Sequence, residues 1–258
     1  MRNRLISGAL ACALLSGGAV AAFAVPASDT TLDFQVKPGS TKAGTKDKPK
    51  ITSLQVTITG ATKSGTGQPS TSTALNTVLP KQWKINAGKW PSKSQCSFTE
   101  VNTDKNASSC PKASKVGSGT SQAKVNDGKG NQDLTVTAFV IKAGDALPDG
   151  GKTKKGDIGF FLKNVGGASV NEMIVGSTPG GNKLNVAIPK QIQEPFPGLP
   201  TGITLLKVKF AGKIKVNGKN VGILTTTGCK NKKWKFTETN VYRDGKKSDS
   251  DTVKCSAA

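Results

Sequence analysis

The closing stretch of the chain, residues 225–255, constrains the fold most strongly, because it alternates regularly and is bracketed by two cysteines. Trp234, Phe236 and Tyr242 share one parity, while lysine, threonine and arginine hold the other. A period of two is typical of a strand with one buried face. Asp244 and Gly245 follow, and both residue types tolerate the positive φ angles of a tight turn. The stretch therefore predicts a β-hairpin.

The alternation also predicts the register of this hairpin. If Asp244-Gly245 is the whole loop, Phe236 faces Val253 and Trp234 faces Cys255. The apolar residues of both strands then lie on the same face of the sheet, as a half-buried hairpin requires.

Cys229 is the natural partner of Cys255, but a flat sheet would keep the two apart. In a three-stranded meander they would flank the Trp234 strand, roughly 9–10 Å apart. A disulfide needs Cα atoms within about 7 Å. The chain must therefore leave the sheet between Cys229 and Trp234, and we expect 221–227 to lie in a facing sheet or to fold back over the end of the hairpin.

The N-terminus has the pattern of a secretory signal peptide. Two arginines precede an apolar run from Leu5 to Val25, and the run contains the small-x-small cleavage motif 22–24, with a second candidate at 25–27. A retained run would be long enough to span a membrane, and Cys12 raises the alternative of lipidation. The glycines and cleavage motifs favour removal of residues 1–24, or of residues up to 27. We expect a secreted or extracellular protein without a membrane span, in free form or associated with the cell wall.

Four cysteines remain after removal of this segment, and the chain contains no histidine. An even number of cysteines in an exported chain indicates disulfides. Of three possible connectivities, the local one, Cys96–Cys110 with Cys229–Cys255, is the simplest and is the one we expect. Wide cysteine spacing and the absence of imidazole argue against zinc. We expect no metal and no cofactor.

The remaining sequence consists of strand-length apolar runs separated by turn residues, and no ten-residue segment has a helical period. We expect an all-β, antiparallel β-sandwich-like fold of roughly eleven or twelve strands with essentially no helix after the signal peptide. The exported domain covers 28–258. The Gly- and Lys-rich segment 143–156 is the best boundary for an alternative division into two lobes.

The three tryptophans, Trp83, Trp90 and Trp234, occupy apolar positions of expected strands or flank them. Exposed aromatic rings would suggest stacking on carbohydrate, whereas packing in the core is the simpler interpretation of these positions.

The composition excludes several kinds of catalysis. Without histidine, Ser-His-Asp and Cys-His arrangements are impossible. Asp244, Asp249 and Asp251 are interleaved with basic residues and indicate a charged hairpin rim, without the spacing of a calcium loop. Asp145, Asp149 and Asp157 lie in or beside a Gly- and Lys-rich loop. We expect a protein that is not an enzyme; the alternative is a secreted hydrolase that uses paired carboxylates or a Ser–Lys pair.

Positive charge is the other prominent feature. After residue 24 the chain carries 35 basic and 16 acidic residues, and all but one of the basic residues are lysine. Lysine-rich surfaces attract polyanions, but specific recognition of bases and phosphates usually needs arginine forks. We therefore expect no sequence-specific binding of nucleic acid. The lysines alternate with apolar residues, which is also typical of a solvated sheet face that is protected against aggregation.

Three stretches carry a resemblance to a known family: 42–50 (KAGTKDKPK), 110–120 (CPKASKVGSGT) and the closing 228–255 with its GC, KWKF and YRDG motifs and final cysteine. They resemble a family of exported all-β proteins of high-GC Gram-positive (actinobacterial) bacteria, to which no activity is assigned. The resemblance extends from about residue 37 to the end of the chain and implies an exported, disulfide-bonded β-fold. Trp83 and Trp90 depart from the family, in which smaller apolar residues are expected.

These features together predict an exported, non-enzymatic binding or structural module at the cell surface or envelope. Its expected partner is an anionic envelope polymer, bound through the lysine-rich surface, or another surface protein. The sequence names no ligand-binding residue.

Overall fold

The structure is a computed structural model, and it describes residues 25–125, 131–165, 170–195 and 198–257. The expected signal peptide, residues 1–24, lies outside the described residues.

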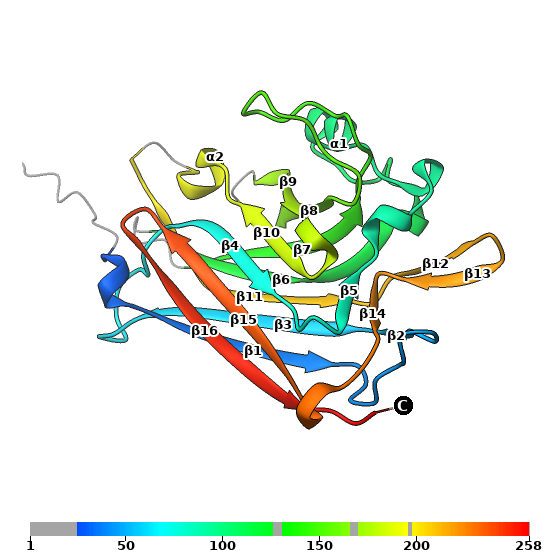
Figure 1. Ribbon diagram of the computed structural model, residues 1–258. Helices are drawn as coiled ribbons and strands as arrows, with labels where there is room; N and C mark the ends of the chain where they lie inside the picture. Colours follow the sequence, from blue (N-terminus) through cyan, green and yellow to red (C-terminus); the bar gives the residue numbers. More distant parts are fainter. Residues whose placement is uncertain (1–24, 126–130, 166–169, 196–197, 258) are drawn as a thin grey trace, which may run out of the picture.

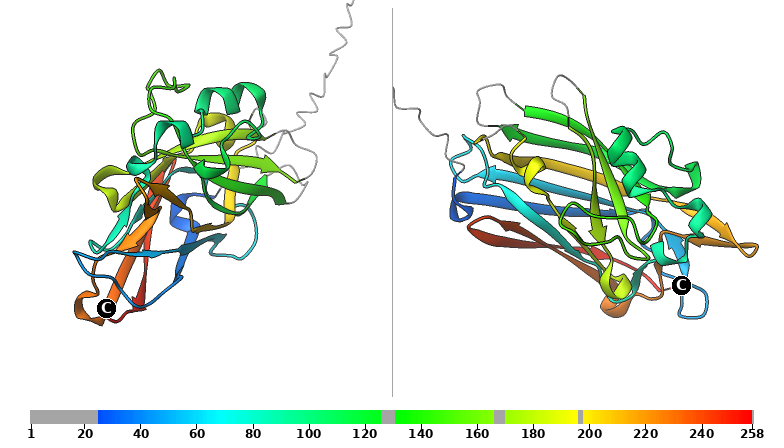
Figure 2. Two further views of the ribbon diagram at one scale, coloured as in Figure 1. Left: turned by 90° about the vertical axis from the view of Figure 1, so that its right-hand side faces the viewer. Right: turned by 90° about the horizontal axis from the view of Figure 1, so that it is seen from above.

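One large antiparallel sheet of 11 strands curls until its two edges meet, so that the protein is a nearly closed barrel (Figure 1). Figure 2 shows the strands curving around a common interior. In spatial order the strands are β1 (Thr30–Pro38), β3 (Leu54–Thr62), β11 (Thr201–Phe210), β6 (Lys115–Val125), β7 (Asn131–Val140), β8 (Ile158–Asn164), β9 (Asn171–Ser177), β10 (Lys183–Ala187), β4 (Ser72–Val78), β15 (Lys233–Tyr242) and β16 (Gly245–Lys254).

The prediction of an all-β, antiparallel fold is confirmed, but the prediction of a sandwich is wrong. A sandwich encloses its core between two sheets, whereas here a single sheet encloses the core. Right-handed twist accumulates over many strands and brings the two edges together. The segment 143–156 connects β7 to β8, and these strands pair directly in the barrel.

The seam between β1 and β16 is bridged by side chains. Every neighbouring pair in the sheet is antiparallel and the number of strands is odd, so the two edge strands run parallel. The carboxylate of Asp249 accepts the backbone N–H of Phe34 at 2.9 Å, and that of Asp251 accepts the N–H of Val36 at 2.8 Å. The interpretation of these aspartates as part of a charged rim is therefore wrong, because they point across the seam.

The hairpin β15–β16 is confirmed, but its register differs from the expected one by two residues. Tyr242 pairs with Gly245, Trp234 faces Val253, and the turn consists of Arg243 and Asp244. A shift of two keeps every side chain on its expected face. Trp234 is therefore buried in the interior, as the alternation predicts.

Contacts with the residues that precede β1 and β4 explain the shift. The carboxylate of Asp244 accepts the backbone N–H of Ala27 at 2.8 Å and the hydroxyl of Ser70 at 3.1 Å. A Cβ at Gly245 would lie 3.2 Å from that of Ala27. Gly245 thus lies in the strand where another segment packs closely, and it does not form the turn.

Two small sheets accompany the barrel. One consists of β2 (Lys50–Thr52), β14 (Leu224–Thr226) and β5 (Trp83–Ile85), and the other is the hairpin of β12 (Lys213–Val216) and β13 (Lys219–Gly222). Figure 1 places both at the same end of the barrel. The predicted departure of 221–227 from the hairpin's sheet is thus confirmed.

The disulfide between Cys229 and Cys255 closes this end of the hairpin, with Cα atoms 5.8 Å apart. The chain turns at Lys230–Lys232, where Asn231 and Lys232 adopt positive φ angles of 55° and 54°. This turn supplies the bend that the cysteine geometry requires.

The second predicted disulfide, Cys96–Cys110, is also present and holds a short layer on the outside of the barrel. It brackets helix α1 (Phe98–Asp104), and a second short helix, α2 (Lys190–Gln193), follows β10. The prediction of essentially no helix is therefore wrong for these two segments. The Ser97 hydroxyl caps α1 by accepting the N–H of Glu100, and Asp145 accepts the N–H groups of Phe98 and Thr99.

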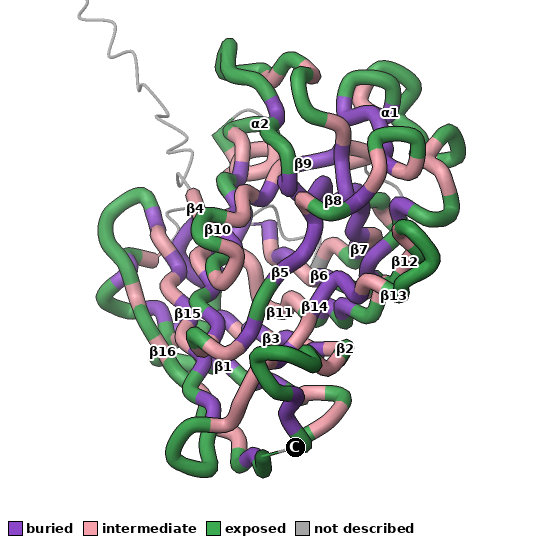
Figure 3. The backbone as a smooth tube through the Cα atoms, turned by 45° about the vertical axis from the view of Figure 1, so that its right-hand side comes forward, coloured by how far each residue is buried: buried purple, intermediate pink, exposed green. Residues whose placement is uncertain are grey.

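The outer layer changes the burial pattern of the strands beneath it. Along β8 both faces are buried, because Phe160 and Leu162 face the barrel interior while Phe161 packs against α1 with Phe139 and Met173. Along β16 exposed and half-buried residues alternate. Figure 3 shows this difference between the two strands.

Candidate ligand cavity

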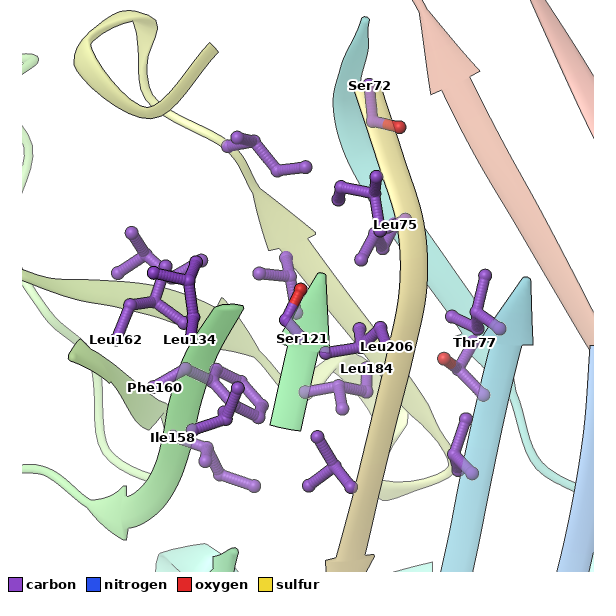
Figure 4. A pocket seen from close by; sticks show the side chains of 18 of the residues that line it. Ser72, Leu75, Thr77, Ser121, Leu134, Ile158, Phe160, Leu162, Leu184 and Leu206 are labelled. Atoms are coloured by element: carbon purple, nitrogen blue, oxygen red, sulfur yellow. The ribbon is translucent and has the colours of Figure 1, made fainter. Parts of the chain in front are cut away.

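A cavity of about 120 Å³ lies inside the barrel. Because side chains alternate along each strand, one row from every strand faces inward, and most of these inward residues are aliphatic. Figure 4 shows Leu134, Ile158 and Phe160 on one side of the space and Leu75 on the other. The apolar lining is contributed chiefly by β3, β6–β11 and β4, and it is aliphatic except for Phe160: Leu54, Val56, Ile58, Leu75, Ala123, Leu134, Val136, Ile158, Phe160, Leu162, Ile174, Leu184, Val186, Leu206 and Val208.

A few polar side chains interrupt this apolar wall. Ser121, on β6, is 6 % exposed, and its hydroxyl points into the space between the labelled groups of Figure 4. Ser72 and Thr77, both on β4, contribute two more hydroxyl groups to the lining. Polar groups of this kind orient a ligand within an otherwise apolar pocket.

Glu238, on β15, is a carboxylic acid buried next to this wall. It is fully buried, and its side chain accepts the hydroxyl of Thr77 at 2.6 Å and the backbone N–H of Asn76 at 3.1 Å. Burial raises the pKa of Glu238 from 4.5 to about 7, although both hydrogen bonds act in the opposite direction. Glu238 therefore changes charge near neutral pH.

Tyr242 and Asn240 follow Glu238 on the inward face of β15, and both are buried. Burial is the main cause that raises the pKa of Tyr242 to about 12; a hydrogen bond with the Asn240 side chain lowers it, and the charge of Glu238 raises it further. The phenol therefore stays protonated at physiological pH.

Aromatic side chains fill the barrel next to the cavity. Trp83 makes edge-to-face contacts with Trp234 and Phe236, with ring centroids 5.1 and 5.2 Å apart. The three tryptophans are at most 2 % exposed, so the prediction that they pack in the core is confirmed. We refer to Trp83, Trp234 and Phe236 as the aromatic plug.

Helix α2 lies beside the cavity, where Ile192 and Pro195 contribute to the lining. Arg243, in the hairpin turn, holds the segment in place: its guanidinium forms an ion pair of 2.6 Å with Glu194 and also donates to the side chain of Gln193. Thr201 at the start of β11 donates to the backbone carbonyl of Ile192. The α2 segment is thus tied to strands on both sides of it.

The residues singled out in the sequence lie elsewhere. Asp244, Asp249 and Asp251 bind backbone N–H groups at the seam. Asp145 caps α1, and Asp157 accepts the N–H of Lys154 at 2.7 Å. Burial raises the pKa of Asp157, while the N–H and the charge of Lys154 lower it.

The sequence interpretation identified none of the cavity residues, because a run of inward-facing aliphatic side chains has the same pattern whether the core is filled or hollow. Two signals were present: Ser121 stands at a strand position of buried parity, and Glu238 interrupts the apolar row of β15. Ser72 gave no such signal, because its parity is opposite to that of Leu75 and Thr77 and it is buried where the pairing of β4 and β15 shifts register. In the part of the chain that the structure describes, no group of three potential metal ligands is found, and no helix is long and apolar enough to cross a membrane.

Comparisons of this chain with protein-family models, with curated proteins and with solved structures found no match.

Proposed function

We propose that this protein is an exported, non-enzymatic binding protein that holds an apolar molecule, or the apolar part of a larger one, inside its barrel. The observation that carries the proposal is the aliphatic cavity of about 120 Å³. The two disulfides are consistent with export.

The size of the cavity supports a binding role. Protein interiors are normally close-packed, and an unfilled void costs about 24 cal/mol per Å³. By that measure a void of 120 Å³ costs about 3 kcal/mol. Cavities of roughly 150 Å³ with a similar lining bind benzene, so the part of the ligand inside the barrel is a small ring or a short hydrocarbon segment.

The test is a calorimetric titration with toluene. We expect saturable binding to the wild-type protein and a melting temperature that rises with toluene concentration. Ser121→Leu introduces an isobutyl group into the cavity, and we expect it to abolish binding.

Ser118→Leu is the matched control, because Ser118 lies on the same strand with its side chain on the exposed face. It adds the same group outside the barrel and is expected to bind toluene normally. Failure of the wild-type protein to bind toluene, or equal loss of binding in both variants, contradicts the proposal.

A second proposed function concerns the lysines, because five of them gather at the disulfide-bonded end of the hairpin. Lys233 pairs directly with Lys254 on the outer face of β15–β16, and like charges in this position repel. The exposed residues of this lysine cluster are Lys230, Lys232, Lys233, Lys235 and Lys254. We propose that they bind an anionic envelope polymer.

Co-sedimentation with purified cell envelope tests this second function. Binding at low salt that is lost at high salt, and lost when Lys233, Lys235 and Lys254 are replaced by Gln, is the expected result, since salt screens exposed charges. Absence of co-sedimentation at both salt concentrations contradicts it.

A further inference from the structure

Buried polar atoms without a hydrogen-bond partner gather on one wall of the barrel. They include the hydroxyl of Ser72 on β4 and the side-chain carbonyl of Asn240 on β15. The hydroxyl of Tyr242, also on β15, lies beside them and interacts with the side chain of Asn240. Ser72 and Tyr242 are direct cross-strand neighbours, at the point where the pairing of β4 and β15 shifts register. The three residues are at most 4 % exposed. We refer to them as the polar triplet.

The polar triplet adjoins the cavity, because Ser72 is part of the cavity lining. More than nine in ten buried polar groups in proteins have a partner, and leaving one without a partner destabilises the folded state. Two such atoms on adjacent strands, beside the Tyr242 hydroxyl and next to an apolar space, match a ligand that brings its own polar group.

The surrounding charges restrict what this polar group is. Glu238 lies on the same face of β15, and Asp249 on β16 stands directly opposite it. Lys247 stands opposite Asn240 on the inward-facing parity of β16, and its ammonium group donates to the backbone carbonyl of Ser28. A carboxylate next to the polar triplet would meet negative charge in a low-dielectric interior, which is unfavourable.

The polar triplet contains both hydrogen-bond donors and hydrogen-bond acceptors. A hydroxyl such as that of Ser72 or Tyr242 donates as well as accepts, and the carbonyl of Asn240 accepts only. A neutral ligand group that both donates and accepts satisfies this set. A hydroxyl is the simplest group of that kind.

We propose that the ligand is a neutral alcohol, with its hydrocarbon part in the cavity and its hydroxyl bound by Ser72, Asn240 and Tyr242. This inference rests on the proposed function, because it names the class of molecule that the cavity holds.

The experiment compares four ligands that share one ring: toluene, benzyl alcohol, benzoate and benzylamine. Calorimetry gives the ratio of the association constants of benzyl alcohol and toluene, for the wild-type protein and for Ser72→Ala. Because toluene lacks the hydroxyl, the ratio isolates the hydrogen bond from the binding of the ring. One lost hydrogen bond corresponds to a fall in this ratio of about fivefold to tenfold.

We expect Ser72→Ala to lower this ratio; dividing by the toluene constant of the same variant removes any change that the substitution makes to the binding of the ring. Tyr242→Phe is the second variant and is expected to lower the same ratio. Ser250→Ala is the matched control, because Ser250 lies on the exposed face of β16. Benzoate is expected to bind most weakly of the four ligands.

The outcomes separate this inference from the function on which it rests. If toluene binds but the ratio is the same in the wild type, Ser72→Ala and Tyr242→Phe, the proposal of an alcohol ligand is wrong, while the proposed binding of an apolar molecule stands. If benzylamine or benzoate binds most tightly of the four ligands, the proposal of a neutral alcohol is also wrong. If toluene does not bind the wild type, the proposed function itself fails.

Discussion

The interior of the barrel contains two neighbouring regions that are built differently. The aromatic plug fills one region with Trp83, Trp234 and Phe236 in edge-to-face contact. The neighbouring region is lined by aliphatic side chains that leave about 120 Å³ open. Both regions obey the same alternation of inward and outward residues, so pattern alone does not distinguish a packed interior from a hollow one.

The difference shows which region of the interior stabilises the fold and which region has space for a ligand. Aromatic rings in close contact contribute both buried area and specific ring geometry. Aliphatic side chains around a void have lost contacts on one side. The plug therefore stabilises the barrel, while the hollow region keeps space for a ligand at some cost in stability.

The largest effect is expected when the same truncation is made in both regions. Phe236→Ala removes a fully buried ring from the plug and is expected to lower the free energy of unfolding by about 4–5 kcal/mol. Phe160→Ala removes a ring that already borders the cavity, and we expect about 3 kcal/mol. Urea unfolding of both variants measures the difference, and equal losses would show that the two regions are packed alike.

An intermediate effect is expected for Glu238→Gln. The pKa of Glu238 is raised from 4.5 to about 7 in the folded protein, so the folded state holds a proton that the unfolded state has lost between these values. Stability from this residue is fully present below pH 4.5 and is lost as the pH rises to 7, by about 3 kcal/mol in total.

Glu238→Gln removes this titration but keeps the size of the side chain. We expect the variant to gain stability relative to the wild type as the pH is raised from 4 to 8, in urea unfolding at each pH. A parallel pH profile for wild type and Glu238→Gln would show that the buried carboxyl does not titrate in this range.

The smallest effect on stability is expected at Arg243, which ties the α2 segment beside the cavity. Its ion pair with Glu194 is partly exposed, so its loss changes stability by less than about 1 kcal/mol. Arg243→Lys keeps the charge but removes the guanidinium that binds Gln193 and Glu194 together. We expect toluene to exchange severalfold faster by NMR, with an unchanged melting temperature. Lys246→Ala, on the same hairpin, is the control, and equal exchange rates in all three proteins would show that α2 does not limit access.

Much of the hairpin region could be predicted from the sequence, because its constraints are local. The alternation around Trp234 fixes which side chains are buried, and the distance limit of a disulfide requires the bend before the strand. The turn was predicted one residue late, since its position depends on contacts of Asp244 and Gly245 with Ala27, more than 200 residues away in the chain.

The sequence did not predict three other features, helix α1, the closure of the barrel and the cavity, and the physical reasons differ. Helix α1 had a recognisable start, because Ser97 and Glu100 have the spacing of a capping box, but the helix is too short to show an apolar period. Closure of the barrel depends on Asp249 and Asp251 reaching β1, and the same two residues also fit an exposed rim in the sequence. The cavity depends on how far opposite walls stand apart, which no local pattern contains.

The seam has a consequence for encounters between molecules. An unpaired strand edge presents a row of backbone N–H and C=O groups on which a second polypeptide can add as a further strand, and such growth leads to aggregates. Here the N–H groups of Phe34 and Val36 already bind the carboxylates of Asp249 and Asp251. A strand of another molecule would have to displace these carboxylates before it could pair with β1. At these two positions the edge of β1 is therefore protected against edge-to-edge strand pairing between molecules.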